Sequence, residues 1–170
     1  MTKFTPSPAE LKNTLEHVHY EIAQLIGTMI ETNNVVVNYA LVESRLIHVR
    51  ALLDFFQKST RRVMRGKELD DVLSLDYGFG PQTVGIPSLY QERLNKDLAH
   101  LTYSRSQRLP AEKPWPHDQV VLPMLECCKP FGEHLILNYL PTNCPEKLAK
   151  WQTLVDKIKY HIDNEAQGWT

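Results

Sequence analysis

The sequence predicts an all-α protein, a bundle of four long helices plus short helices, folded as a single domain over residues 1–170. Apolar residues recur at three- and four-residue steps in several long segments, which is the spacing of an amphipathic helix. Hydrophobic residues make up 42% of the chain and charged residues 23%, proportions that exclude a disordered chain. A chain of this length also buries enough surface for a hydrophobic core.

The first helix is predicted to begin after Ser7 and to end near Thr32. Ser7-Pro8-Ala9-Glu10 combines a serine N-cap, a proline at the first helical position and a glutamate that closes a capping box. The stripe that faces the core is expected to consist of Leu11, Leu15, Val18, Ile22, Leu25, Ile26 and Met29.

A second helix is predicted over residues 35–58, after a break at Asn33 and Asn34. Its apolar residues leave almost no polar face, which is typical of a centrally buried helix, so we expect it to be the most buried one. The valines that open it would also suit a strand, but no partner run of alternating residues occurs elsewhere, and this favours the helix.

The segment that follows is less regular. Residues 58–67 are basic, and the acidic residues 68–75 are expected to form one short helix. Residues 77–87 hold three of the seven glycines and are predicted to be a loop. Ser88 then opens a helix that ends near Ser104. Its buried face is expected to carry Leu94, Leu98 and Leu101.

Prolines shape the last third of the chain. Three of them make residues 110–116 a stiff connector, and residues 118–140 are expected to be helical but kinked or split at Pro123 and Pro130. Pro145 begins the last helix, whose buried stripe is predicted to be Leu148, Trp151, Val155, Ile158 and Ile162.

Charge and cysteine content limit the cellular setting and the partners. With 19 Lys and Arg against 20 Asp and Glu the net charge is −1, which does not favour a protein that grips duplex DNA over its whole surface. No run is long enough to span a membrane, and the N-terminus lacks the apolar core of a signal peptide. Cys127, Cys128 and Cys144 do not form a disulfide framework, so we expect a cytoplasmic protein without a membrane partner.

Two predicted helices carry organised polar groups. On the second helix, Glu43 and Arg50 share one stripe with Asp54 beside them, and His48 lies on a stripe of apolar residues. These four residues are candidate binding residues; the alternative is a structural ion-pair cluster and a core histidine. On the helix opened by Ser88, a stripe opposite Leu98 is expected to face solvent. It consists of Arg93 and His100, flanked by Lys96, Asp97 and Tyr103.

The spacing Arg93-Leu-Asn-Lys-Asp-Leu-Ala-His100 resembles the Arg-x4-6-His motif of the HEPN superfamily. Those proteins are small helical bundles, and many are metal-independent RNA endonucleases of bacterial toxin and defence systems. The resemblance implies that Arg93 and His100 are catalytic and that a homodimer brings two copies of the pair together. Residues 43–56 and 94–105 are also similar to uncharacterised bacterial helical proteins of no established activity.

The chemistry of such a pair is coherent. His100 would exchange protons with the 2′-hydroxyl and the leaving oxygen near neutral pH, and Arg93 would hold the charged phosphate as a bidentate donor. Lys96 and Arg105 are candidate binding residues for neighbouring phosphates, and Tyr103 is a further candidate binding residue. The cluster that would widen this positive surface consists of Arg61, Arg62 and Arg65.

The sequence gives less support to a metal site. Glu16-x-x-His19 and Asp97-x-x-His100 have the spacing of di-iron bundles, but too few further ligands accompany them, so we expect no metal and no cofactor. Three functions remain open: a helical interaction module that dimerises or binds a protein partner, a HEPN-like ribonuclease or RNA-binding protein, and a bundle that binds a small ligand or a metal.

Overall fold

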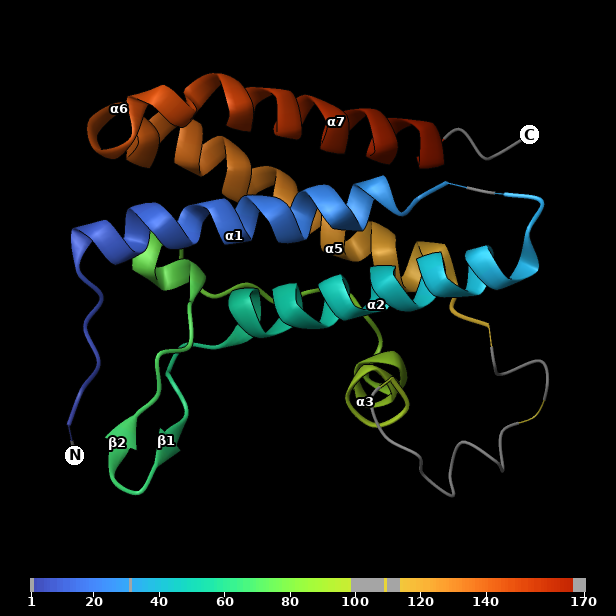
Figure 1. The fold of residues 1–170 in the computed structure, drawn as a ribbon, viewed down its shortest axis with the longest axis horizontal. Helices are drawn as coiled ribbons and strands as arrows, with labels where there is room; N and C mark the ends of the chain where they lie inside the picture. Colours follow the sequence, from blue (N-terminus) through green and yellow to red (C-terminus); the bar gives the residue numbers. More distant parts are fainter. Residues whose placement is uncertain (1, 31, 99–108, 110–113, 167–170) are drawn as a thin grey trace.

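The computed structural model describes residues 2–30, 32–98, 109 and 114–166, and within them the protein has the all-α class that the sequence predicts (Figure 1). The four long helices lie side by side as a bundle, with the shorter elements along its edges and ends. Their bounds are α1 Pro8–Gly27, α2 Val35–Gln57, α5 His117–His134 and α7 Leu148–Ala166.

Helix α1 begins as its sequence predicts. The Ser7 hydroxyl accepts from the Glu10 N–H at 3.3 Å, and the Glu10 carboxylate accepts from the Ser7 N–H at 2.7 Å, so the capping box is complete. The helix ends at Gly27, earlier than the expected Thr32, because the Thr28 hydroxyl donates to the carbonyls of Gln24 and Leu25.

Helix α2 is buried only along its C-terminal part, where its leucines and both phenylalanines enter the core. The prediction that it is the most buried helix is wrong for the part that begins at Val35. There Val35, Val36 and Tyr39 are exposed, because the elements that pack on α2 (α1, α5 and the short α3, Ser88–Lys96) leave this face uncovered. Apolar composition alone did not reveal how far the neighbouring helices extend.

The expected short helix over residues 68–75 is not formed. A hairpin of β1 Val63–Met64 and β2 Lys67–Glu68 stands there instead, and helical structure starts only at the 3-10 helix η1, Ser74–Tyr77. Arg65 and Gly66 form the two-residue turn with φ values of 53° and 78°, the left-handed geometry that matches strand twist in a hairpin. Asp71 and Asp76 bind arginines across this segment, and these ion pairs compete with helix formation.

Prolines split the C-terminal half of the chain, as expected, but not at the expected residues. Helix α5 contains both Pro123 and Pro130. It continues into a π-helical turn, η3 Leu135–Tyr139, in which the Leu140 N–H donates five residues back to the Leu135 carbonyl. Pro141 supplies no N–H for the next bond, which explains this widened turn. The short helix α6, Leu140–Asn143, then ends at Cys144, and Pro145 starts the 3-10 helix η4, Pro145–Lys147, ahead of α7.

The core lies between α1, α2, α5 and α7. Its aromatic centre is held by edge-to-face contacts, with Phe131 of α5 touching the rings of Phe55, Phe56, Tyr77 and Trp151. Helices α5 and α7 approach each other closely at Gly132, where a Cβ would lie 2.5 Å from the Val155 Cγ2. These contacts fix the frame on which the candidate sites lie.

Candidate functional surfaces

Arg93 is buried rather than facing solvent. Its side chain lies on α3 with only 4% of its surface exposed, and its guanidinium carbon lies 3.9 Å from the centre of the Trp115 ring. It also donates to the Pro114 carbonyl at 3.1 Å and lies 3.7 Å from the Asp97 carboxylate. The expectation of an outward stripe at Arg93 is therefore wrong, because the segment around Trp115 folds over it.

Of the other residues in the Arg-x6-His hypothesis, only some lie in the part of the chain that the structure describes. Helix α3 ends at Lys96, so the helix predicted to reach Ser104 is shorter. His100, Tyr103 and Arg105 lie outside the described residues. Lys96 is exposed and pairs with Glu92 at 2.5 Å, one turn earlier on the same helix.

The ion-pair cluster predicted on α2 is not formed. Asp54 pairs with Lys58 at 2.8 Å, and Glu43 is exposed. Among the described residues no ion pair joins Arg50 to either carboxylate, since Asp54 pairs with Lys58 one turn further along the helix. Glu43 and Arg50 thus remain available to groups outside the chain.

His48 is a core histidine at the contact of α1 and α2. It is 8% exposed, and its Nδ1 lies 2.7 Å from the Glu21 Oε2. The Tyr20 ring meets its imidazole edge-on at 5.9 Å. The pairing with Glu21 joins the two helices, and nothing in the spacing along one helix could have indicated it.

The arginines expected to widen a positive surface are largely neutralised. Arg61 pairs with Asp76 at 2.6 Å, both largely buried, and Arg62 pairs with Asp71 at 2.6 Å. The Arg62 guanidinium holds the pKa of Asp71 below its ordinary value. The Arg62–Asp71 pair therefore closes the base of the hairpin, and the Arg61–Asp76 pair fastens it to η1.

The described residues contain neither a cysteine with a lowered pKa nor a group of side chains placed to bind a metal ion. Burial raises the pKa of the Cys128 thiol well above its ordinary value and that of Cys127 less far, so neither is an activated thiolate. No group of three His, Cys, Asp or Glu side chains is placed to hold a metal ion in this part of the chain. None of its helices combines the length and the apolar character that crossing a membrane requires.

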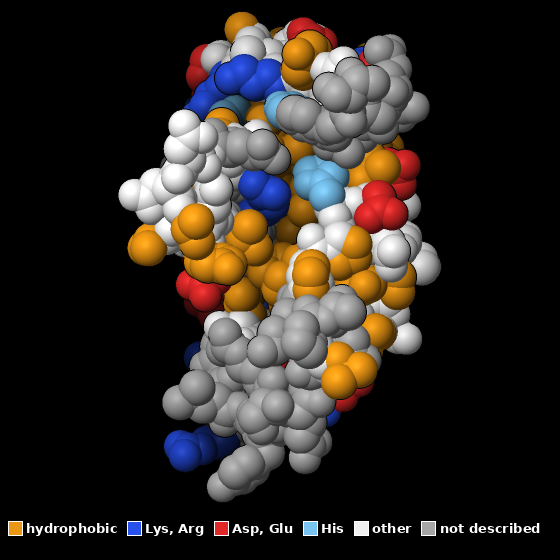
Figure 2. Space-filling view, turned by 90° about the vertical axis from the view of Figure 1, so that its right-hand side faces the viewer, with side chains coloured by type: hydrophobic (Ala, Val, Ile, Leu, Met, Phe, Trp, Pro, Cys, Tyr) orange, Lys and Arg blue, Asp and Glu red, His pale blue; other side chains and the backbone are white. Residues whose placement is uncertain are grey.

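One surface of α2 is uncovered and apolar apart from one glutamate. We call it the α2 stripe; its side chains follow each other at three- and four-residue steps and are all exposed, Val36 by 75% and Ile47 by 56%. Figure 2 views the end of the bundle at which α2 begins; hydrophobic side chains are exposed there around a hollow, with Lys or Arg and His side chains beside it. The α2 stripe consists of Val36, Ala40, Glu43, Ile47 and Ala51.

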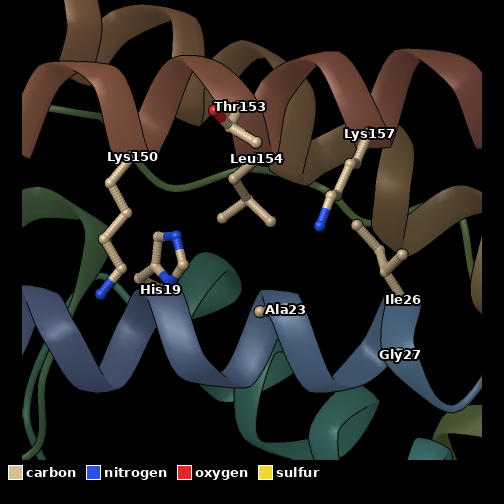
Figure 3. A pocket seen from close by; sticks show the side chains of 8 residues that line it. All are labelled: His19, Ala23, Ile26, Gly27, Lys150, Thr153, Leu154 and Lys157. Carbon is tan, nitrogen blue, oxygen red and sulfur yellow. The ribbon is translucent and has the colours of Figure 1, made fainter.

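A groove runs between α1 and α7, with a volume of about 310 Å³ (Figure 3). Lys150, at one end, pairs with Glu16 beyond the groove, and Lys147 pairs with the same carboxylate. His19 packs edge-on against Trp151, with ring centres 5.3 Å apart. Sequence reasoning missed this groove, although small residues at a four-residue step, Ala23 and Gly27, are a signal for one.

Comparison of the chain with protein-family models, with curated proteins and with solved structures gives no match. The resemblance to HEPN proteins therefore stays a prediction.

Proposed function

We propose that this chain is a cytoplasmic helical interaction module that forms a homodimer through the α2 stripe. The observation that supports this most directly is the uncovered apolar face of α2, which exposes Val36 and Ile47 instead of packing them. Burial of apolar surface by a partner stabilises the complex by about 25 cal/mol for each Å² removed from water. The cytoplasmic setting is supported by the three cysteines, which are all free thiols.

The stripe has the geometry of a helix–helix contact. Its residues recur at the steps that keep one face of a helix toward a partner. Ala40 and Ala51 are small, so the axis of a second helix can approach closely on either side of Ile47. A partner that lies along the stripe therefore needs to be helical and apolar itself.

A second copy of the chain meets these requirements. Glu43 and Arg50 lie on opposite sides of Ile47, and an antiparallel α2 pair with its twofold axis near Ile47 places each Glu43 beside the Arg50 of the other copy. Two complementary charge pairs then flank an apolar centre. The net charge of −1 adds little repulsion between copies. A contact made by a single helix pair is small, so we expect a dissociation constant of about micromolar order.

Sedimentation velocity over a concentration series tests this proposal. The wild-type chain is expected to shift from monomer to dimer, and Ile47→Glu is expected to remain a monomer because a charge at the apolar centre opposes burial. Leu137→Glu is the matched control: Leu137 is 74% exposed, and it lies in the π-helical turn at the end of the bundle away from the start of α2 (Figure 1).

Circular dichroism should show that both variants keep the helical content of the wild type, since both substitutions replace exposed side chains. A wild-type chain that remains a monomer at all concentrations would overturn the proposal. Equal loss of the dimer in Ile47→Glu and Leu137→Glu would place the contact elsewhere.

A further inference from the structure

The groove between α1 and α7 exists because α1 presents small residues to α7. Ala23 and Gly27 lie one turn apart on the face of α1 that also carries His19 and Ile26. A Cβ added at Gly27 would meet no atom within 4 Å, so space remains there that a larger side chain would fill. Helix α7 packs closely on α5 instead, as at Gly132, and this leaves room on its side toward α1.

Charge in the groove is positive on balance. None of the residues that line it is acidic, and it carries two lysines, seven residues apart on α7. Lys150 is already paired with Glu16. Lys157 extends across the opposite end in Figure 3 and has no ion pair with any described residue. Lys157 is thus an exposed ammonium group at the groove without an acidic partner among the residues that the structure describes.

The remaining lining is apolar or neutral. Ile26 and Leu154 supply aliphatic walls, and Ala23 supplies the floor (Figure 3). Burial and then the neighbouring Lys150 lower the pKa of His19, so its imidazole is neutral near pH 7. A neutral imidazole packed on Trp151 provides a flat surface and a hydrogen-bonding nitrogen.

The volume limits the size of a ligand. A water molecule occupies about 30 Å³ of liquid, so about 310 Å³ corresponds to roughly ten waters, or to a compact organic molecule with on the order of ten to fifteen non-hydrogen atoms. A molecule of this size matches the volume of the groove as it stands.

We infer that this groove binds a small organic carboxylate with a flat or aliphatic apolar body, its carboxylate on Lys157 and its body on Ala23, Ile26 and Leu154. The site lies between α1 and α7, apart from the α2 stripe, and does not depend on dimer formation. Charge complementarity sets the orientation of the ligand, and apolar burial supplies much of the affinity.

Titration calorimetry with 1-naphthoate, and with the isosteric neutral 1-naphthamide, tests this inference. We expect 1-naphthoate to bind with a dissociation constant of about 1 mM or below, as ligand efficiency allows for some thirteen non-hydrogen atoms, and roughly tenfold more tightly than the amide. Failure of 1-naphthoate to saturate by about 10 mM, or equal binding of the two probes, would overturn the inference.

Variants locate the site. Lys157→Gln is expected to remove the preference for the carboxylate, and Ala23→Leu to abolish binding of both probes by filling the floor. Lys3→Gln, which removes an exposed lysine of the N-terminal segment, is the matched charge control and should bind like the wild type. Unchanged binding in Lys157→Gln would count against the site even if Ala23→Leu failed to fold.

Discussion

The Arg93 guanidinium lies against aromatic rings, and this placement gives it a structural role that its spacing to His100 did not indicate. The Trp115 ring faces it at 3.9 Å, and Tyr90 lies on the same helix with its ring centre 5.4 Å away. The guanidinium is planar, so it can pair with a carboxylate at its edge while its face stacks on an aromatic ring. Arg93 therefore fastens the segment around Trp115 onto α3.

Replacing this arginine should reduce stability. Arg93→Ala is expected to lower the free energy of unfolding by about 2–4 kcal/mol, because it removes the stack on Trp115 and leaves the Pro114 carbonyl without the hydrogen bond that Arg93 donates. Arg93→Lys should recover less than half of the loss, since an ammonium cannot stack on Trp115. Urea unfolding measures the change, and a red shift in tryptophan emission reports release of Trp115. Unchanged stability in Arg93→Ala would show that the stack on Trp115 does not fasten this segment.

Glu16 links α1 to the C-terminal elements through Lys147 and Lys150. These two ammonium groups lower the pKa of the Glu16 carboxyl to about 2. Because the pKa is lower in the folded state, the stabilisation is complete above the ordinary value of about 4.5 and is lost as pH falls toward 2.

Glu16→Gln should therefore make the free energy of unfolding depend less on pH in the acid range. The wild type is expected to lose stability between about pH 4.5 and 2, and the variant to lose less over the same interval. The difference should be about 1 kcal/mol or smaller, since the Glu16 side chain is 42% exposed and solvent screens the pair. Thermal unfolding at a series of pH values measures it; identical profiles for the two chains would show that the pair contributes nothing.

At the scale of elements, the sequence predicts the features that are fixed by residues close together in the chain. The capping box at Ser7 and Glu10 fixes where α1 begins, and both residues act within one turn. The end of α3 and the hairpin at Arg65 depend on contacts with distant residues, such as Trp115 on Arg93 and Asp76 on Arg61. Periodicity along the chain carries no information about these contacts.

The packing of α5 on α7 provides a prediction at this scale. Gly132→Ala should destabilise the protein by about 1–3 kcal/mol, because the new Cβ would lie 2.5 Å from Val155, a β-branched side chain with little freedom to move. Gly27→Ala should instead stabilise it by about 0.5 kcal/mol, since the added methyl meets nothing and reduces the entropy of the unfolded chain. Chemical denaturation compares the two, and equal effects would contradict the close approach of α5 and α7.

At the scale of the whole molecule, the α2 stripe and the α1–α7 groove lie where one helix is not covered by its neighbours. The sequence identifies α2 as apolar, but the exposure of Val36 and Ile47 depends on the lengths and positions of α1, α3 and α5. The α1–α7 groove likewise requires two helices that are far apart in sequence. Sites of this kind become visible only when all the long helices are placed together.

The proposed twofold contact makes a charge-reversal prediction. Glu43→Arg and Arg50→Glu should each weaken the dimer roughly tenfold, because each places like charges together at two symmetry-related positions worth about 0.5–1 kcal/mol apiece. The double variant should recover wild-type association, since it exchanges the two charges without changing their complementarity. Sedimentation at low salt measures all four chains, and circular dichroism checks that each is folded. Additive losses in the double variant would exclude the antiparallel pairing of α2, because only residues that face each other across the axis can compensate in this way.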